Sequence, residues 1–172
     1  GFSHAKAGED MAKHLIERGY RTFGYVGSQG GADLRATKRF DAFSRVIREA
    51  GASLVFNRSP EGATSMEVGR QITDEVLGQP NPPGAVYYAN DDLAAGGIMH
   101  CLAEGISIPK QIALAGFNGL GFLSALPKLL TTTVTPRFEI GKAAASWLMH
   151  SDTTEAIQKT ELSAKLRIGE TT

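Results

Sequence analysis

Three cations gather in the first turns of one predicted helix. Arg35, Lys38 and Arg39 follow a glycine-rich loop, "GSQGGAD", that ends a short apolar run. Cations are unfavourable at a helix N-terminus because the helix dipole is already positive there. One explanation is surface salt bridging to Asp33 and Asp41. The other is an anion site, in which backbone N–H groups, the dipole and guanidinium groups bind a carboxylate or a phosphate. Both explanations stay open at the level of sequence.

A second polar group follows an apolar run that predicts a buried strand. In "VYYANDDLAAGG", residues 86–97, the run ends in Asn90, Asp91 and Asp92. Asn and Asp are both strong N-cap residues, so Asn90 or Asp91 is predicted to cap the helix over 92–104. Asp92 is interpreted as a first-turn carboxylate that the helix dipole favours.

The hydrophobic pattern alternates between helical and strand periods along the chain. Helices are predicted over 6–18, 34–50, 65–77, 92–104 and from Pro136 to about His150; strands are predicted over 22–26, 53–57, 85–89, 112–117, 130–135 and in the tail "ELSAKLRIG". This alternation predicts βαβ units and a parallel sheet covered on both faces. Ligands bind such sheets at the carboxyl ends of the strands. The polar segments at those ends are 27–39, 58–65, 90–92 and 118–121. Two weak linker candidates, 79–84 and 151–154, do not separate domains.

Length and composition predict one globular domain and exclude several classes of protein. The 172 residues suffice for a hydrophobic core. Lys plus Arg and Asp plus Glu number 18 each, and this zero net charge argues against nucleic-acid binding by the chain itself. A single cysteine, Cys101, excludes an internal disulfide and fits a reducing compartment. No apolar run reaches the ~20 residues that cross a bilayer. The N-terminus lacks the features of a signal peptide and an initiator Met, which suggests that Gly1 is a cut point inside a longer chain.

The enzyme interpretations lack their motifs. Glycines at positions 24, 27, 30 and 31 do not form G-x-G-x-x-G, and no acidic residue ends the run "SLVFN". There is no P-loop and no G-x-S-x-G elbow. The four histidines are scattered, and Cys101 is interpreted as a small buried hydrophobe. We therefore expect no catalytic activity, no cofactor and no metal.

Four segments together resemble one family. "AVYYANDDLAAGGIMHCLAEGISIPKQIALAGFN" resembles the effector-binding core of LacI/GalR-type bacterial transcription regulators. "AGEDMAKHLIERGYRTFGYVG", "RFDAFSRVIREAG" and "LTTTVTPRFEIGKAA" resemble further family motifs, in the family's order and near its spacing. Within the last segment, "TPRFEIG" is similar to the gluconate-repressor branch. The four matches cover nearly the whole chain.

The resemblance implies a three-layer parallel-sheet α/β subdomain of the periplasmic binding protein-like type I fold. Residues 1–134 would form the C-terminal effector-binding subdomain. Residues 135–172 would form a return segment toward the N-terminal subdomain and a final strand. A helix-turn-helix domain, outside this chain, would bind operator DNA. The resemblance also implies a cytoplasmic homodimer that regulates carbohydrate metabolism, expected to be a repressor, with no membrane partner.

The resemblance also implies site residues. Arg39 would contact hydroxyls or carboxylates of a small-molecule effector, and Asn90 would bind the effector through its amide. Asp91 would support Asn90 or cap the helix, and the expected division is that the Asn90 side chain turns to the effector while Asp91 holds the helix start and its loop. Further predicted contacts are Thr64 and Ser65 before one helix, Thr135 and Arg137 where the chain crosses back, and Arg35 in the cationic cluster.

One position departs from the family. Asn118 stands in "GFNG" where the family has an effector-binding aspartate. The change removes a negative charge, while Arg39 and Arg137 add positive ones, so we expect the effector to be a sugar acid such as gluconate, or its phosphate. A neutral sugar bound through other groups is the alternative.

Two functional alternatives and one question of assembly stay open. A periplasmic-type sugar-binding protein of a transport system shares this fold. A Rossmann-type enzyme is the third interpretation, which the glycine spacing does not support. For assembly, Phe122, Leu123 and Leu126 follow the fourth predicted strand and belong either to a dimer interface or to the core.

Overall fold

The structure, a computed structural model, describes residues 1–29, 32–150 and 160–172. The helices are α1 (His4–Glu17), α2 (Leu34–Glu49), α3 (Met66–Leu77), α4 (Asp91–Ala103) and α5 (Arg137–His150), with a short 3-10 helix η2 (Gly121–Ala125). The strands are β1 (Thr22–Val26), β2 (Ser53–Arg58), β3 (Ala85–Tyr88), β4 (Ala113–Asn118), β5 (Thr131–Val134) and β6 (Lys165–Arg167). No helix in the described ranges is long and apolar enough to cross a bilayer.

Most helices begin where a short polar side chain caps them. The Ser3 side chain accepts a hydrogen bond at the start of α1, and Asp33 does the same at α2. Ser65 caps α3, and Asn90 caps α4. Each cap satisfies a backbone N–H that the helix leaves without a partner. The predicted helices and the first five predicted strands are all present, with ends that differ by at most two residues.

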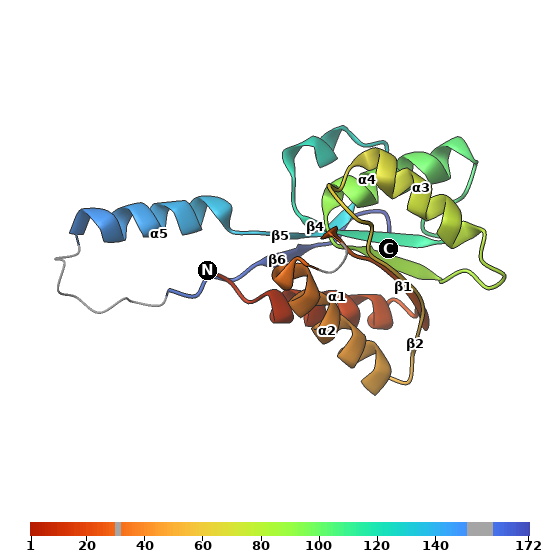
Figure 1. Cartoon of the computed structure of the whole chain (residues 1–172), viewed down its shortest axis with the longest axis horizontal. Helices are drawn as coiled ribbons and strands as arrows, with labels where there is room; N and C mark the ends of the chain where they lie inside the picture. Colours follow the sequence, from red (N-terminus) through yellow and green to blue (C-terminus); the bar gives the residue numbers. More distant parts are fainter. Residues whose placement is uncertain (30–31, 151–159) are drawn as a thin grey trace.

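The six strands form one sheet in the order β2-β1-β3-β4-β5-β6. The pairs from β2 to β5 are parallel. α1 and α2 cover one face of the sheet, and α3 and α4 cover the other (Figure 1). This arrangement confirms the predicted three-layer α/β fold. From β1 the chain moves to β2 on one side of the sheet, and then returns to β3 on the other side of β1, so the strand order reverses between β1 and β3. Ligands bind α/β sheets at the carboxyl ends of the strands beside such a reversal.

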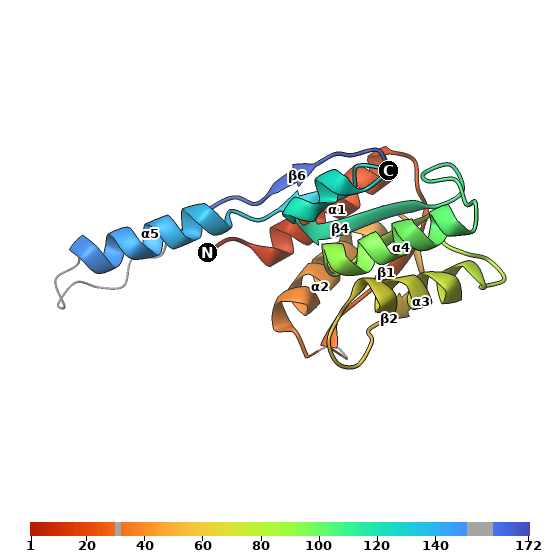
Figure 2. The ribbon, with the colours of Figure 1, turned by 90° about the horizontal axis from the view of Figure 1, so that it is seen from above.

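The two edge strands differ from the prediction. β2 was expected to be buried on both faces, but it is an edge strand whose Val55 is 45% exposed. β6 is shorter than the predicted tail strand and pairs antiparallel with β5. Figure 2 shows the reason: α5 points away from the body of the protein, and the chain returns beside β5 in the opposite direction. Of the two linker candidates, 79–84 joins α3 to β3, and 151–154 lies outside the described residues.

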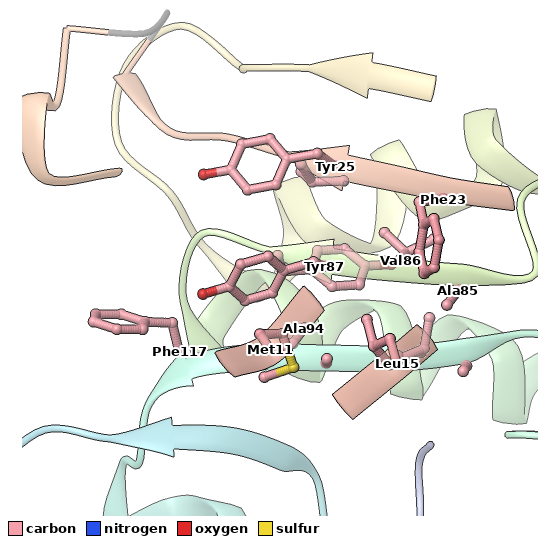
Figure 3. Close-up of a cluster of buried hydrophobic side chains, with 14 of the residues drawn as sticks. Met11, Leu15, Phe23, Tyr25, Ala85, Val86, Tyr87, Ala94 and Phe117 are labelled. Atoms are coloured by element: carbon pink, nitrogen blue, oxygen red, sulfur yellow. The ribbon is translucent and has the colours of Figure 1, made fainter. Parts of the chain in front are cut away.

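Aromatic side chains fill the core between the sheet and the layer of α1 and α2. The rings of Phe23 and Phe43 meet edge to face with centroids 5.8 Å apart, and the rings of Tyr25 and Tyr87 meet at 5.7 Å. In Figure 3 the hydroxyls of Tyr25 and Tyr87 point the same way, toward the end of the sheet where Phe117 lies. The apolar core therefore ends in polar groups at the carboxyl ends of the strands.

The segment after β4 packs inward. Leu123 is fully buried, and Phe122 and Leu126 are partly buried against the core. These contacts favour the core interpretation of the three residues, so they no longer support a dimer interface. Cys101 is also buried, as predicted, and burial raises the pKa of its thiol to about 11.

Glycine sets the distance between α3 and α4. A Cβ at Gly69 would lie 2.1 Å from the carbonyl oxygen of Leu93, and a Cβ at Gly96 would lie 1.9 Å from that of Met66. Real Cβ atoms do not approach backbone oxygens this closely. The small residues of "LAAGG" thus allow α4 to pack on α3 while its first turn stays at the end of β3.

We predict that Gly96→Ala lowers the free energy of unfolding by about 1–3 kcal/mol, because the two helices must move apart. The matched control is Gly141→Ala in α5, where a Cβ would meet nothing within 4 Å. Alanine there should raise the free energy of unfolding by about 0.5–1 kcal/mol through helix propensity. Urea unfolding of the two variants measures both effects, and an unchanged Gly96→Ala variant would contradict the packing argument.

Candidate ligand-binding site

Arg39 lies at the reversal of strand order. It stands on α2, which follows β1, and its Nη2 donates a hydrogen bond of 2.8 Å to the carbonyl oxygen of Ala89, directly after β3. Its guanidinium carbon also lies 3.7 Å above the ring of Phe117, near the end of β4. One side chain of α2 therefore contacts the carboxyl ends of both β3 and β4.

The Arg39 guanidinium is buried without an acidic partner. The residue is only 4% exposed, and no carboxylate of the described residues lies within ion-pair distance. Its Nη1 lies 2.9 Å from Nδ1 of His4, and its Nε makes no hydrogen bond of normal geometry. Burial, together with the charge of Arg39, lowers the pKa of His4 to about 4. The positive charge of Arg39 is thus met only by neutral groups.

A second buried polar group lies nearby. Tyr87 is fully buried, and its hydroxyl has no hydrogen-bond partner of normal geometry in the described part of the chain. Burial raises the pKa of Tyr87 to about 12, and the Arg39 side chain opposes part of that rise through its charge and a hydrogen bond that falls outside normal geometry. The phenol therefore stays neutral at the same end of the sheet.

Asn90 both caps α4 and contacts the neighbouring loop. Its Oδ1 accepts a hydrogen bond of 3.0 Å from the backbone N–H of Leu93, and its Nδ2 donates one of 2.8 Å to Oγ1 of Thr64. Of the two predicted caps, Asn90 is therefore correct and Asp91 is not. Thr64 and Asn90 lie together, as a shared role in the site requires. Ser65 is exposed, and its hydroxyl accepts from the N–H of Val68 at the start of α3.

Asp91 points into the protein and not toward the cap. It is 0% exposed. Its Oδ1 accepts a hydrogen bond of 2.6 Å from the hydroxyl of Thr132 on β5, and its Oδ2 accepts one of 2.9 Å from the N–H of Leu120. Burial raises the pKa of Asp91, and these hydrogen bonds oppose the rise. The carboxylate fixes the loop after β4 against β5.

Asn118 lies in that loop, and the crossing segment meets its backbone. The residue has a positive φ of 122° and is partly buried. Its carbonyl oxygen accepts hydrogen bonds from the Thr135 hydroxyl at 3.2 Å and from Nη2 of Arg137 at 3.5 Å. The structure thus brings three predicted site residues together. Arg137 itself is exposed.

The structure resolves the cationic cluster into two kinds of residue. Arg35 is exposed, and its Nε lies 3.6 Å from Oδ1 of Asp33. This favours surface salt bridging for Arg35, which does not join the site. Lys38 is exposed as well. Of the three cations, only Arg39 is buried.

His4 and Tyr87 were not predicted as site residues. His4 was interpreted only as one of four scattered histidines, and Tyr87 as part of a strand. Their positions depend on contacts with Arg39, which is 35 residues from His4 in the sequence. No local pattern marks such a contact.

A separate hollow of about 250 Å³ lies beyond α2, near the ends of β1 and β2. It is lined by Tyr25, Gly27, Ser28, Ala36, Thr37, Phe40, Asp41, Asn57 and Ser59. None of these residues is a predicted site residue.

Comparison with known proteins points to one family. A family model described as "Periplasmic binding protein-like domain" matches residues 12–172. The chain is 35% identical over 153 residues to the HTH-type transcriptional regulator GntR of Pseudomonas aeruginosa, across 87% of this chain and 43% of that protein. It is 29% identical over 150 residues to the HTH-type transcriptional regulator IdnR of Escherichia coli, across 87% and 44%. The chain therefore spans less than half of the length of these relatives.

Solved structures show the same similarity. A LacI family transcriptional regulator from Silicibacter pomeroyi matches with a TM-score of 0.92 and 36% identity, over 99% of this chain and 52% of that one. The transcription regulator GntR from Chromobacterium violaceum matches with a TM-score of 0.90 and 30% identity, over 99% and 64%. The fold is thus similar over nearly the whole chain.

We predict that Asp91→Ala lowers the free energy of unfolding by about 2–4 kcal/mol, because it leaves the buried Thr132 hydroxyl and the partly buried Leu120 N–H without this acceptor. Asp92→Ala is the matched control: Asp92 is the adjacent first-turn carboxylate, and its loss should cost less than about 1 kcal/mol. Chemical unfolding of both variants makes the comparison. Equal effects would show that Asp91 acts only through the helix dipole.

Proposed function

We propose that this chain, which belongs to the periplasmic binding protein-like domain family, is the effector-binding part of a LacI-type transcriptional regulator. The relatives named above support this, because they are HTH-type transcriptional regulators and LacI family structures. They are not named as transport proteins or enzymes, so they lend no support to those alternatives. We further propose that the whole protein is a cytoplasmic homodimer that represses genes of carbohydrate metabolism. It would bind operator DNA through a helix-turn-helix domain outside this chain.

The proposed effector is a sugar acid, such as gluconate, or its phosphate. The observation that carries this is the buried Arg39 guanidinium, which has no acidic partner among the described residues. A buried charge without a counter-charge is costly. A ligand carboxylate or phosphate would supply the missing charge and could accept a charge-assisted hydrogen bond from the guanidinium.

Two neighbouring residues support the same ligand class. By the family resemblance described above, Asn118 takes the place of an aspartate, and a neutral side chain there would not repel an anion. Arg137 adds a second positive charge beside the Asn118 carbonyl. Asn90 and Thr64, which hydrogen-bond to each other, would bind ligand hydroxyls. We therefore assign the anion to Arg39 and the polyol to the amides and hydroxyls around it.

The form of α5 supports a site between two lobes. α5 extends away from the sheet (Figure 1). Its Phe138, Leu148 and Met149 are 79%, 73% and 79% exposed, which is unusual for large apolar side chains. We propose that they pack on a second lobe outside this chain. The division into residues 1–134 and 135–172 follows from the same idea, with the last strand returning to β5.

We predict that the full protein containing this chain binds sugar acids in preference to neutral sugars in a calorimetric panel. Asn118→Asp should weaken gluconate binding by about tenfold or more, because it restores a negative charge beside the anion. Binding of neutral sugars should not fall. The proposal fails if neutral sugars bind and acids do not, or if Arg137→Ala leaves acid binding unchanged.

We also predict that the isolated chain of 172 residues binds the effector at least about tenfold more weakly than the full protein, because one lobe buries only part of a ligand. Calorimetry on both forms with the same acid tests this. Equal affinity would contradict the two-lobe proposal while leaving the ligand class untouched.

A further inference from the structure

His4 is the first residue of α1, and contacts on several sides fix its ring. Its centroid lies 4.4 Å from that of Phe2 and 5.9 Å from that of Phe117. Its Nδ1 lies 2.9 Å from Nη1 of Arg39. α1 approaches α2 this closely because Gly8 has no side chain: a Cβ there would lie 2.1 Å from the carbonyl oxygen of Arg39. The imidazole is therefore part of the Arg39 site.

The direction of the His4–Arg39 hydrogen bond follows from chemistry. A guanidinium can only donate, so Nδ1 of His4 must accept, and the imidazole must be neutral with its proton on Nε2. The charged groups that act on His4 favour this form. Arg39, Arg35 and Lys38 on α2 disfavour a second positive charge, and only Asp33 opposes them.

A neutral acceptor can orient the Arg39 guanidinium without cancelling its positive charge, which a carboxylate would not do. A carboxylate at this position would orient the guanidinium and also neutralise it. The imidazole orients it and leaves its charge in place. Three exposed arginines elsewhere are paired with carboxylates: Arg45 with Glu9 and Glu49, Arg58 with Glu75, and Arg70 with Glu67. Arg39 is instead held by an imidazole, a backbone carbonyl and an aromatic ring.

We propose that His4 is a specificity-determining positioning residue, a neutral acceptor that orients the Arg39 guanidinium and keeps its charge for the anionic group of the ligand. This rests on the proposed function, since it concerns the same site. It adds a reason why the site would select an acid, because the selectivity would depend on His4 as well as on Arg39.

The test compares two six-carbon probes, D-gluconate and the neutral polyol D-glucitol, by calorimetry on the full protein at neutral pH. His4→Asp should weaken gluconate binding by about tenfold or more, because the aspartate neutralises Arg39. Glucitol binding should not fall. His4→Asn is the conservative variant: its Oδ1 can replace Nδ1 as a neutral acceptor, so gluconate binding should stay within about threefold of the wild type.

Ala5→Asp is the control for charge alone. It adds the same negative charge at the next, exposed residue and should change gluconate binding by less than about threefold, because exposed charges are screened. Asp is favourable in the first turn of a helix, so both aspartate variants should fold, which thermal unfolding checks.

The outcomes separate the two proposals. A wild-type protein that does not prefer gluconate to glucitol overturns the proposed function. A wild-type protein that does prefer it, with a His4→Asp variant that keeps the preference, overturns the role of His4 alone. Equal losses in His4→Asn and His4→Asp would show that His4 only supports the packing of α1, which also overturns its role in selectivity.

Discussion

The hydrogen bond from Arg39 to the carbonyl oxygen of Ala89 ties together the parts of the molecule that form the site. It links α2 to the end of β3 at the reversal of strand order. A buried guanidinium is stable only where its N–H groups and its charge are met. The Phe117 ring and the His4 imidazole supply part of this from β4 and α1. Elements far apart in sequence therefore converge on one side chain, and the geometry of the site depends on it.

The order of helices and strands could be predicted because it depends on neighbouring residues. The hydrophobic period and polar caps are local, and the cap of α4 is one of the two residues expected for it, Asn90. The behaviour of the edges could not be predicted in this way. The apolar run of β2 looks like that of a buried strand, but whether Val55 is covered depends on the next strand in the sheet. The direction of β6 likewise depends on the path of α5, which its own sequence does not encode.

The candidate site also combines features that local sequence predicts with features that depend on tertiary contacts. Asn90, Asp91 and Asp92 are similar polar residues in a row, and sequence alone could not separate their roles. A helix turns each successive side chain by about 100°. Asn90 therefore stays at the helix start, while Asp91 reaches Thr132, 41 residues away. The family resemblance predicts a ligand-binding role for Arg39, but it does not predict the contact of Arg39 with His4, which joins two segments that carry no common motif. The assignment of these residues to a ligand stays a prediction.

Two buried charges lie at this end of the sheet, and the protein treats them in opposite ways. Asp91 receives hydrogen bonds from Thr132 and Leu120, so its carboxylate is satisfied and serves to fix the loop. Arg39 receives neutral partners, and its Nε has none of normal geometry in the described part of the chain. Removing a charged group from water normally opposes ligand binding. The Arg39 guanidinium is already removed from water by folding, so ligand binding does not add that cost. On the proposed function, the remaining cost would fall on the ligand anion, and the arrangement would then select a ligand that brings a negative charge.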